Sequence, residues 1–174
     1  MKHPLDKFAY CPVCGAKTFL QHNEKAKKCA ACGFVYYFNP SAAVACFIRN
    51  KKGELLLVRR AKEPAKGTLD LPGGFVDLHE TAEDAACREV KEETGLTITN
   101  CKYLFSLSNI YPYCGFDVHT VDMFFECHVD NFELAFAEDD AAEIIILSPE
   151  KLNPDDFGLC SIKKGVDRYI HFCK

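Results

Sequence analysis

The chain has 174 residues, enough for one ordinary domain plus a small appendage, and its 48% hydrophobic and 26% charged residues are typical of a globular protein. A net charge of -4 provides no broad basic surface, so we expect no nucleic acid partner. No apolar run is long enough to span a bilayer, and the first residues lack the apolar core of a signal peptide, so we expect no membrane association.

Two C-x-x-C pairs lie near the N-terminus, Cys11 with Cys14 and Cys29 with Cys32, and each is followed by a glycine. Four thiolates at this spacing fit a tetrahedral zinc ion, and a shell closed by four sulfurs makes such a zinc structural. Two alternatives stay open: a redox-active pair, which needs a strand-to-helix context, and two separate disulfides, which need an oxidising compartment. We interpret the other cysteines, which are scattered, as small buried hydrophobes of a cytoplasmic protein.

Residues 1–38 are too few to bury a useful core, so we expect Zn2+ to drive their folding as a zinc ribbon. Asn39-Pro40 marks the boundary to the main domain, which we place at 39–174. Four aromatic residues follow the second cysteine pair, where they would cover the zinc module or line a homodimer contact. They are Phe34, Tyr36, Tyr37 and Phe38.

The first part of the main domain predicts a β-hairpin followed by a glycine-rich loop. Its strands are residues 42–49 and 54–59, joined by a turn at 50–53. A loop at 62–68 then leads to a Pro-Gly-Gly run that ends at Gly74. Glycines let a backbone approach a ligand closely, so this run is a candidate part of a binding site.

The strongest helix pattern spans residues 80–94, with Thr81 as N-cap and Gly95 as the stop. Three glutamates within it lie at i, i+3 and i+4, so they share one face of the helix. Like charges in this arrangement destabilise a bare helix, but they suit a hard divalent cation. The pattern therefore indicates metal-assisted chemistry on a phosphate-bearing substrate. The three residues are Glu89, Glu92 and Glu93.

The second half of the main domain predicts three strands and a final helix. Two strands lie around residues 98–107 and 119–129, with a loop at 109–117 between them. A short buried strand follows at 143–147, and apolar residues at helical spacing predict a helix over 162–170.

The segment that begins at Gly74 matches a family pattern, G-x5-E-x7-R-E-U-x-E-E-x-G-U with U aliphatic, at every fixed position. This pattern is the Nudix box, and the Leu-Pro-Gly-Gly run at its start also resembles family sequence. So many fixed positions at fixed spacing leave little room for chance. The resemblance covers about residues 42–174. The matching positions are Gly74, Glu80, Arg88, Glu89, Val90, Glu92, Glu93, Gly95 and Leu96.

The resemblance implies an α/β fold, the Nudix α/β/α sandwich with a mixed sheet. It also implies hydrolysis of the diphosphate linkage in a nucleoside diphosphate joined to another group. By resemblance, Glu92 and Glu93 bind Mg2+ or Mn2+, and Glu89 is a ligand or a base. The carbonyl of Gly74 completes the metal shell. By the same resemblance, the residues that orient and pair with these carboxylates are Arg88 and Glu80.

The family often takes a further acidic ligand from outside the box. We expect Glu143 in this role, because it directly precedes an apolar stretch that resembles the E-A-x-W-F sequence of zinc-ribbon NADH pyrophosphatases. The alternative is that Glu143 is an ordinary carboxylate at the edge of a strand. The other candidates are Glu138, Asp139 and Asp140.

A zinc ribbon before a Nudix box resembles the NADH pyrophosphatase branch, which carries the motif S-Q-P-W-P-F-P-x-S after the box. This chain has no tryptophan, but the same region contains Tyr111-Pro112-Tyr113, which keeps an aromatic-Pro-aromatic centre. Tyr111 and Tyr113 are candidates to stack on a base or a nicotinamide. The alternative is a packed loop made rigid by proline.

We therefore expect a metal-dependent pyrophosphatase acting on ADP-ribose, an NAD(H)-like dinucleotide or a similar small molecule of the nucleoside diphosphate type. One alternative is a house-cleaning nucleoside triphosphate pyrophosphatase that releases pyrophosphate. Another, from a different class, is a sensor that binds a nucleotide without cleaving it. The complete set of glutamates argues against the sensor, which has no need for the full metal cluster.

Overall fold

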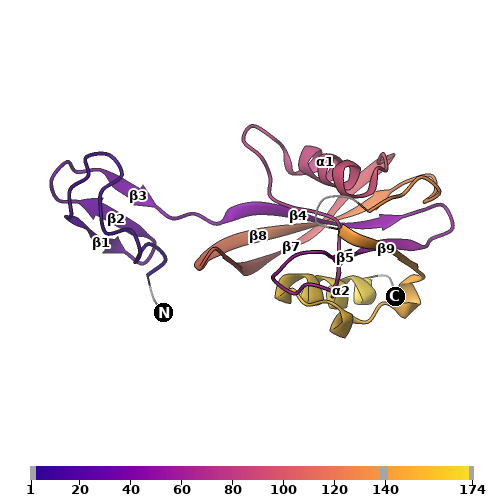
Figure 1. Ribbon diagram of the computed structural model, residues 1–174. Coiled ribbons are helices and arrows are strands. Elements are labelled where there is room, and N and C mark those ends of the chain that lie inside the picture. Colours follow the sequence, from indigo (N-terminus) through magenta and orange to yellow (C-terminus); the bar gives the residue numbers. More distant parts are fainter. Residues whose placement is uncertain (1–2, 138–140, 173–174) are drawn as a thin grey trace.

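The computed structural model describes residues 3–137 and 141–172, which form a small sheet followed by a larger α/β unit (Figure 1). The small sheet is antiparallel, in the order β1-β2-β3. Its buried cluster consists of Phe19, Cys11 and Cys29, with Phe34 packed against it. So small a core agrees with a module whose folding depends on a metal. The strands are β1 (Phe19–Asn23), β2 (Ala26–Cys29) and β3 (Val35–Tyr37).

The larger unit contains a mixed sheet with the strand order β6-β5-β4-β8-β7, and β9 pairs with β5. The central pair, β4 with β8, is parallel, while the other strand pairs are antiparallel. The predicted hairpin is confirmed, because β4 and β5 pair around the expected turn. The strands are β4 (Ser41–Arg49), β5 (Leu55–Arg60), β6 (Leu69–Asp70), β7 (Asn100–Tyr113), β8 (Phe116–His128) and β9 (Ala141–Leu147).

Helices cover both faces of this sheet, α1 (Ala82–Thr94) on one and α2 (Cys160–Phe172) on the other (Figure 1). Alternate residues of β4 point to opposite faces, as in any strand. Ile48 therefore packs in the cluster under α1, while Phe47 packs in the cluster under α2 and stacks on Tyr169 at 3.8 Å between ring centroids. The expected α/β/α sandwich with a mixed sheet is thus confirmed.

Two sequence predictions about strands need correction. The loop expected at 109–117 is wrong: β7 runs on to Tyr113, β8 begins at Phe116, and only Cys114-Gly115 forms the turn. The strand pairing extends this far because Pro112, which has no N–H, is compatible with an edge strand. The strand expected at 143–147 exists as part of β9, but it is half exposed rather than buried, because it lies at the other edge of the sheet.

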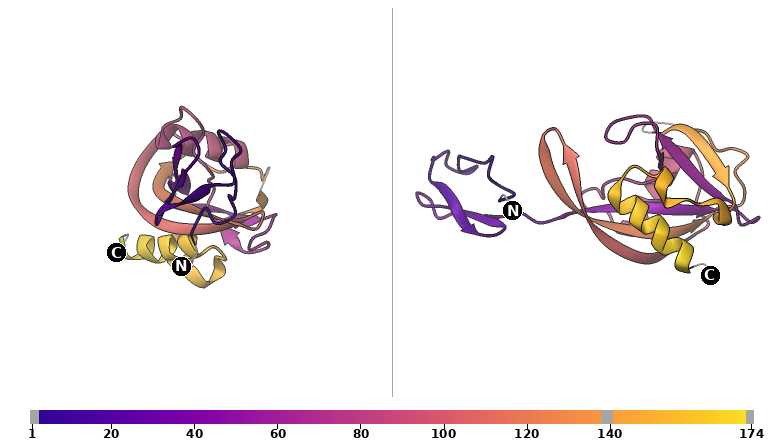
Figure 2. Two further views of the ribbon diagram at one scale, coloured as in Figure 1. Left: turned by 90° about the vertical axis from the view of Figure 1, so that its left-hand side faces the viewer. Right: turned by 90° about the horizontal axis from the view of Figure 1, so that it is seen from below.

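The long hairpin of β7 and β8 reaches toward the small sheet (Figure 2). At its tip, Phe116 packs edge-on against Phe8 and Phe38, with ring centroids 5.9 and 5.8 Å apart. The ammonium group of Lys7 donates a hydrogen bond to the carbonyl of Gly115. The two units are therefore connected by side-chain contacts as well as by the chain between β3 and β4.

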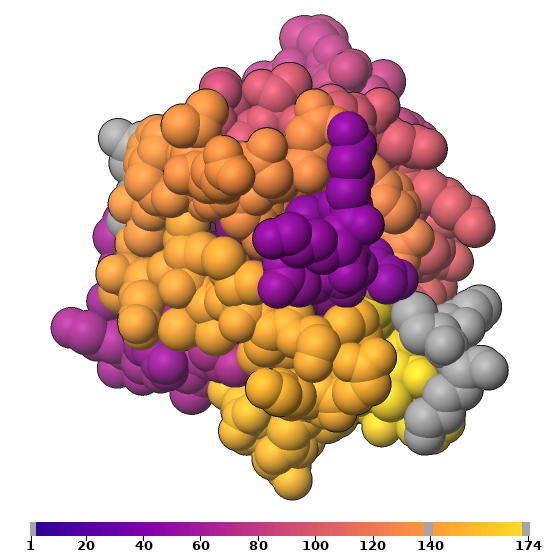
Figure 3. Space-filling view, turned by 90° about the vertical axis from the view of Figure 1, so that its right-hand side faces the viewer, coloured from indigo at the N-terminus to yellow at the C-terminus, as the bar shows by residue number. Residues whose placement is uncertain are grey.

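At the end of the larger unit away from the small sheet, the turn between β4 and β5 reaches the surface among segments of the later chain (Figure 3). Lys51 in this turn forms an ion pair with Asp130 at 2.7 Å, which ties the turn to the segment after β8. Neither of the described helices is long and apolar enough to cross a membrane.

Candidate functional site

Helix α1 forms where the sequence predicts it, and local interactions explain both of its ends. The hydroxyl of Thr81 accepts a hydrogen bond from the backbone N–H of Asp84 at 3.1 Å, which satisfies one of the free donors of the first turn. Gly95 closes the helix in the left-handed conformation, with φ of 70°, and its N–H donates to the carbonyl of Lys91. These caps set where the helix begins and ends, and burial of Ala85, Ala86 and Val90 in the core turns the glutamate face away from it.

Arg88 is the centre of the carboxylate cluster on α1. Its Nε and Nη2 atoms donate to the two carboxylate oxygens of Glu80, at 2.8 and 2.9 Å. Its Nη1 atom donates to Glu89 at 2.7 Å and to Glu92 at 3.0 Å, and Nη2 also donates to the carbonyl of Phe75 at 3.0 Å. The planar fork of one guanidinium therefore orients three carboxylates and the loop that precedes the helix.

The glycine run brings the loop backbone against this cluster. The carbonyl of Gly74 accepts a hydrogen bond from the N–H of Val44 at 2.8 Å, so the loop is bound to the edge of β4. A side chain at Gly74 would come within 2.5 Å of a carboxylate oxygen of Glu89. On the other side, the N–H of Gly73 donates to Glu93 at 3.3 Å. The absence of a side chain at Gly74 thus lets the half-buried carboxylate of Glu89 lie against the loop backbone, and the buried Glu93 contacts the same loop through the N–H of Gly73.

The cluster carries an excess of negative charge, because three carboxylates share the guanidinium of Arg88. Burial raises the pKa of Glu89, and the charges of Glu92 and Glu80 add to this effect, while Arg88 opposes it. The hydrogen bond from Arg88 lowers the pKa of Glu80. Carboxylate and carbonyl oxygens on one face are the ligands that Mg2+ and Mn2+ prefer, so the donor set fits a hard divalent cation.

A cavity of about 170 Å3 opens beside Glu93 and the glycine run. A cavity that holds a single water has a volume of only about 10–15 Å3, so this cavity has room for a small ring. Phe75 and Tyr111 form an aromatic wall, edge to face, with ring centroids 6.3 Å apart. The polar lining residues are Arg60, Asp70, Asn109, Thr120, Asp122 and Ser161.

The structure brings some of the predicted substrate and metal residues to this cavity and leaves others away from it. Tyr111 lines the cavity, whereas Tyr113 is 62% exposed and stacks on Tyr111 from outside. The carboxylate of Glu143 on β9 pairs with Arg59 at 3.0 Å, and Glu143 is not among the lining residues. The other acidic candidates, Glu138, Asp139 and Asp140, lie outside the described residues.

The polar residues of the cavity were not among the site residues predicted from the sequence. For Asp122 the sequence does contain a signal. Thr120, Asp122 and Phe124 occupy alternate positions of β8, so their side chains share one face of the strand. All three are buried, so an aspartate stands on a core-facing position of the strand. Buried aspartates are rare unless they have partners or a function. Arg60 and Asp70 come from different strands, and no local pattern connects them.

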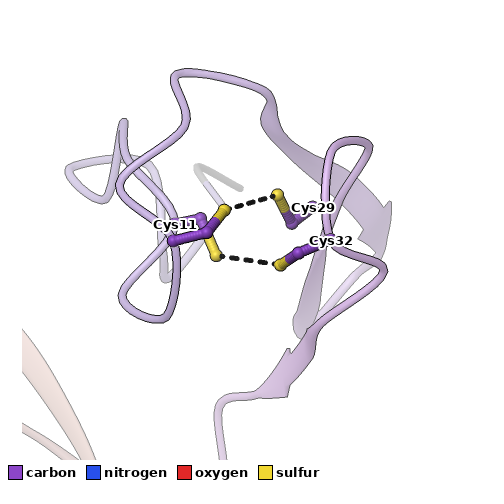
Figure 4. A group of neighbouring side chains, drawn as sticks. Cys11, Cys29 and Cys32 are labelled. Carbon is purple, nitrogen blue, oxygen red and sulfur yellow. Dashed lines mark hydrogen bonds between the residues drawn. The ribbon is translucent and has the colours of Figure 1, made fainter.

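The four cysteines of the N-terminal pairs converge on one point (Figure 4). The Sγ atoms of Cys11 and Cys32 lie 3.7 Å apart, and those of Cys14 and Cys29 lie 3.6 Å apart. Four sulfurs at the usual Zn–S distance are separated by about 3.8 Å in a tetrahedron, so the cluster fits a structural zinc. These separations are too long for disulfides, whose sulfurs are about 2.05 Å apart.

The alternative of a redox-active pair also lacks its structural context. Among the described residues of the small sheet, neither cysteine pair is followed by a helix. Each pair lies instead in a tight turn in which the N–H of the glycine donates to the carbonyl of the first cysteine at 2.9 Å. These glycines, Gly15 and Gly33, have φ of 71° and 78°, a conformation that glycine adopts without strain.

Comparison with known proteins agrees with both parts of the structure. The family model for the NUDIX domain matches residues 39–163, and the model for the NADH pyrophosphatase zinc ribbon domain matches residues 6–37. A crystal structure of a NUDIX hydrolase from Nitrosomonas europaea has the same fold, with a TM-score of 0.71 at 23% identity. The likeness covers 93% of this chain and 90% of that one.

Two relatives in other organisms are similar in sequence. An NAD-capped RNA hydrolase, NudC, from Vibrio vulnificus is 32% identical over 110 residues, which are 63% of this chain and 41% of that protein. An ADP-ribose pyrophosphatase from Methanocaldococcus jannaschii is 42% identical over 109 residues, which are 62% of this chain and 61% of that protein. The chain therefore spans less than two thirds of either relative.

The fold, the complete box with its carboxylates gathered around Arg88, and the match over residues 39–163 show that this chain belongs to the Nudix family.

Proposed function

We propose that this protein is a metal-dependent hydrolase that cleaves the diphosphate bond of a nucleoside diphosphate joined to another group. The observation that carries the proposal is the placement of Glu93 and the glycine run, which border the carboxylate cluster on one side and the aromatic cavity on the other. A substrate with a base in the cavity would present its phosphates to the cluster.

The residues that would hold Mg2+ or Mn2+ are Glu89, Glu92 and Glu93, with the carbonyl of Gly74. This carbonyl already accepts one hydrogen bond, from Val44, and its second lone pair is left for a cation. When bound, the divalent ion neutralises charge on the phosphoryl oxygens and makes a water more nucleophilic. Glu143 is a proposed further ligand, although the structure shows its carboxylate in an ion pair with Arg59.

The protein's own groups supply positioning and proton transfer. Arg88 holds the carboxylates in place before substrate arrives, so little reorganisation is needed during the reaction. In its alternative role to that of a metal ligand, Glu89 is the candidate base that takes a proton from an attacking water, and burial raises the pKa of its carboxyl group. The wall formed by Phe75 and Tyr111 provides a face on which a base or nicotinamide can stack.

For the substrate class, we propose ADP-ribose and dinucleotides related to NAD(H). Two relatives carry names that refer to NAD-capped RNA and to ADP-ribose, and NAD contains an ADP-ribose unit. We interpret this shared unit as the part of the substrate that the cavity and the carboxylate cluster recognise together.

A panel of substrates with Mg2+ or Mn2+, followed by product identification, tests this function. Cleavage of ADP-ribose to AMP and ribose 5-phosphate supports the proposal, and cleavage of NADH to two mononucleotides does the same. Release of pyrophosphate from a nucleoside triphosphate would instead show a house-cleaning enzyme. Binding without turnover of any member of the panel would show a nucleotide sensor and contradict the proposal.

For the small sheet we propose a structural role, in which Zn2+ holds Cys11, Cys14, Cys29 and Cys32 and no position is left open for chemistry. We also propose a reducing, cytoplasmic environment, because the thiolates must stay unoxidised to bind the metal. Tyr36 and Tyr37 are exposed and suit a homodimer contact, which sedimentation analysis would test.

A further inference from the structure

The cavity beside the carboxylate cluster contains a buried aspartate that the proposed hydrolysis does not use. Asp122 on β8 is 7% exposed. Its Oδ1 atom accepts a hydrogen bond from the hydroxyl of Thr120 at 2.5 Å, and its Oδ2 atom accepts one from the side-chain amide of Asn109 at 3.1 Å. Both donors are neutral, so they hold the carboxylate in place without neutralising its charge.

The other cavity carboxylate is in a different situation. Asp70 pairs with the guanidinium of Arg60 and accepts a second hydrogen bond from the N–H of Leu71 at 2.9 Å. Among the residues that the structure describes, Asp122 has no ion pair with lysine, arginine or histidine. A carboxylate has about four lone-pair sites, and Asp122 uses two of them. The remaining acceptor capacity faces a cavity rather than bulk water.

A second polar group in the same cavity has no partner. Ser161 near the start of α2 is 2% exposed and lines the cavity, and its Oγ atom forms no hydrogen bond within the described structure. Leaving a buried hydroxyl unpaired costs roughly 1–3 kcal/mol, so such groups normally have a partner. An unpaired hydroxyl and an underused carboxylate in one cavity are what a site that awaits a polar ligand would show.

The geometry points to Asp122 as a specificity-determining residue: we propose that it accepts an N–H donor from the amino group of a base such as adenine, which stacks on one ring of the wall formed by Tyr111 and Phe75. Asn109 and Thr120, which also line the cavity, act as positioning residues, because their side chains donate to the two carboxylate oxygens of Asp122. Ser161 supplies a further hydroxyl to the ligand. This inference rests on the proposed function, since the same cavity must deliver the diphosphate to Glu93.

Charge explains why an amino group is the expected partner. A buried carboxylate attracts hydrogen-bond donors and repels groups that present only lone pairs, such as a carbonyl oxygen. At C6, adenine carries an amino group where hypoxanthine carries a carbonyl oxygen, and at N1 adenine has a lone pair where hypoxanthine has an N–H. The two bases have nearly the same shape, and the 6-amino group is the donor that we assign to Asp122. A comparison between them therefore changes the hydrogen bond to Asp122 while it leaves the stacking and the phosphates unchanged.

The test compares ADP-ribose with IDP-ribose, which has hypoxanthine in place of adenine, as substrates of the wild-type protein and of Asp122→Asn. We expect kcat/KM of the wild type to be at least tenfold higher for ADP-ribose, because a hydrogen bond to a charged group has about this effect. In Asp122→Asn the ratio should fall toward one, since the amide can donate to the hypoxanthine oxygen. Asp117→Asn, an exposed position on the same strand, is the matched control and should keep the wild-type ratio.

The dissociation constants of AMP and IMP for the wild-type protein provide a second test of the role of Asp122. This test needs neither turnover nor a folded variant. A preference for AMP of at least about tenfold supports the inference. Equal affinity for AMP and IMP, binding of neither, or an unchanged ratio in Asp122→Asn would overturn it. If both ADP-ribose and IDP-ribose are cleaved equally well, the inference fails while the proposed function stands. If no member of the substrate panel is cleaved, the proposed function fails, and the binding ratio of AMP to IMP still decides the role of Asp122.

Discussion

At the scale of single residues, one arginine organises the carboxylate cluster. Arg88 uses all three of its guanidinium nitrogens, and its partners lie eight residues before it, next to it and four residues after it in the chain. With the spacing of the Nudix box, the side chain of Arg88 reaches Glu80 in the loop before α1 as well as Glu89 and Glu92 on the helix. Lysine would offer a single point charge without the planar fork, so it would orient fewer of these groups.

A second group of charged residues, far from the box, predicts how stability depends on pH. Burial acts to raise the pKa of Glu126, but the hydrogen bond from Tyr169 and the charges of Arg49 and His128 outweigh it and lower the pKa below its ordinary value of 4.5. A lowered pKa in the folded state means that the carboxylate stabilises the fold above about pH 4.5 and loses this effect as the pH falls through the folded-state pKa.

We therefore expect Glu126→Gln to lower the melting temperature at neutral pH, with a difference from the wild type that shrinks in acid. Thermal melts between about pH 7 and pH 3 measure this difference. Asp117→Asn serves as a control, because Asp117 is exposed on the same strand. A difference for Glu126→Gln that stayed constant over the whole range would show that the lost contacts are not ionic.

At the scale of elements, prediction from the sequence succeeded where the determining interactions are local. The bounds of α1 follow from Thr81 and Gly95, whose caps involve residues three or four positions away. The hairpin of β7 and β8 is longer than predicted, because Pro112 suggests a loop, whereas on an edge strand it can lie opposite Asp117 without breaking the pairing. The exposure of β9 was missed because its place at the sheet edge depends on pairing with β5, which lies far away in the chain.

Gly73 and Gly74 provide a matched pair of substitutions in the loop before α1. A Cβ at Gly73 would overlap the carbonyl of Val44, which belongs to the backbone of β4 and cannot move freely. A Cβ at Gly74 would instead meet the carboxylate of Glu89, the far end of a flexible side chain. We expect Gly73→Ala to lower stability by roughly 1–3 kcal/mol. Gly74→Ala should retain the fold and lose most activity, because Glu89 is displaced.

Chemical denaturation and steady-state kinetics on the two variants separate these effects. If Gly74→Ala unfolds readily, or if Gly73→Ala is as stable as the wild type, the observed geometry of the loop is contradicted. Equal activity of Gly74→Ala and the wild type would show that Glu89 does not need its observed position.

At the scale of the whole molecule, two features could not be predicted from the sequence, because they join distant segments. The cavity gathers Arg60, Asp70, Asp122 and Ser161 from three strands and a helix, and no spacing in the chain connects them. The small sheet contacts the hairpin tip through Phe116. The box and the cysteine pairs were found because each has a fixed local spacing.

Removal of zinc should disorder the small sheet and leave the larger unit folded. The small sheet has too small a core to fold without the metal, whereas the larger unit has a buried cluster on each face of its sheet. Treatment with a strong chelator, followed by limited proteolysis, should cut the chain before residue 39 and spare the rest. A Cys32→Ser variant should behave in the same way without the chelator. A digestion pattern that does not change on zinc removal would contradict the structural role of the metal.

Metal-dependent hydrolysis at the carboxylate cluster is tested by the rate of ADP-ribose hydrolysis by the wild type and by Glu93→Gln, as Mg2+ or Mn2+ is titrated. Glu93 is 8% exposed and contacts the backbone of Gly73, so the isosteric amide should preserve the fold while it removes a charge from the metal site. We predict metal-dependent turnover by the wild type and a loss of at least about a hundredfold in Glu93→Gln, with unchanged melting temperature. Turnover in Glu93→Gln equal to that of the wild type, or wild-type turnover that persists without a divalent ion, would contradict a metal-dependent reaction at this cluster.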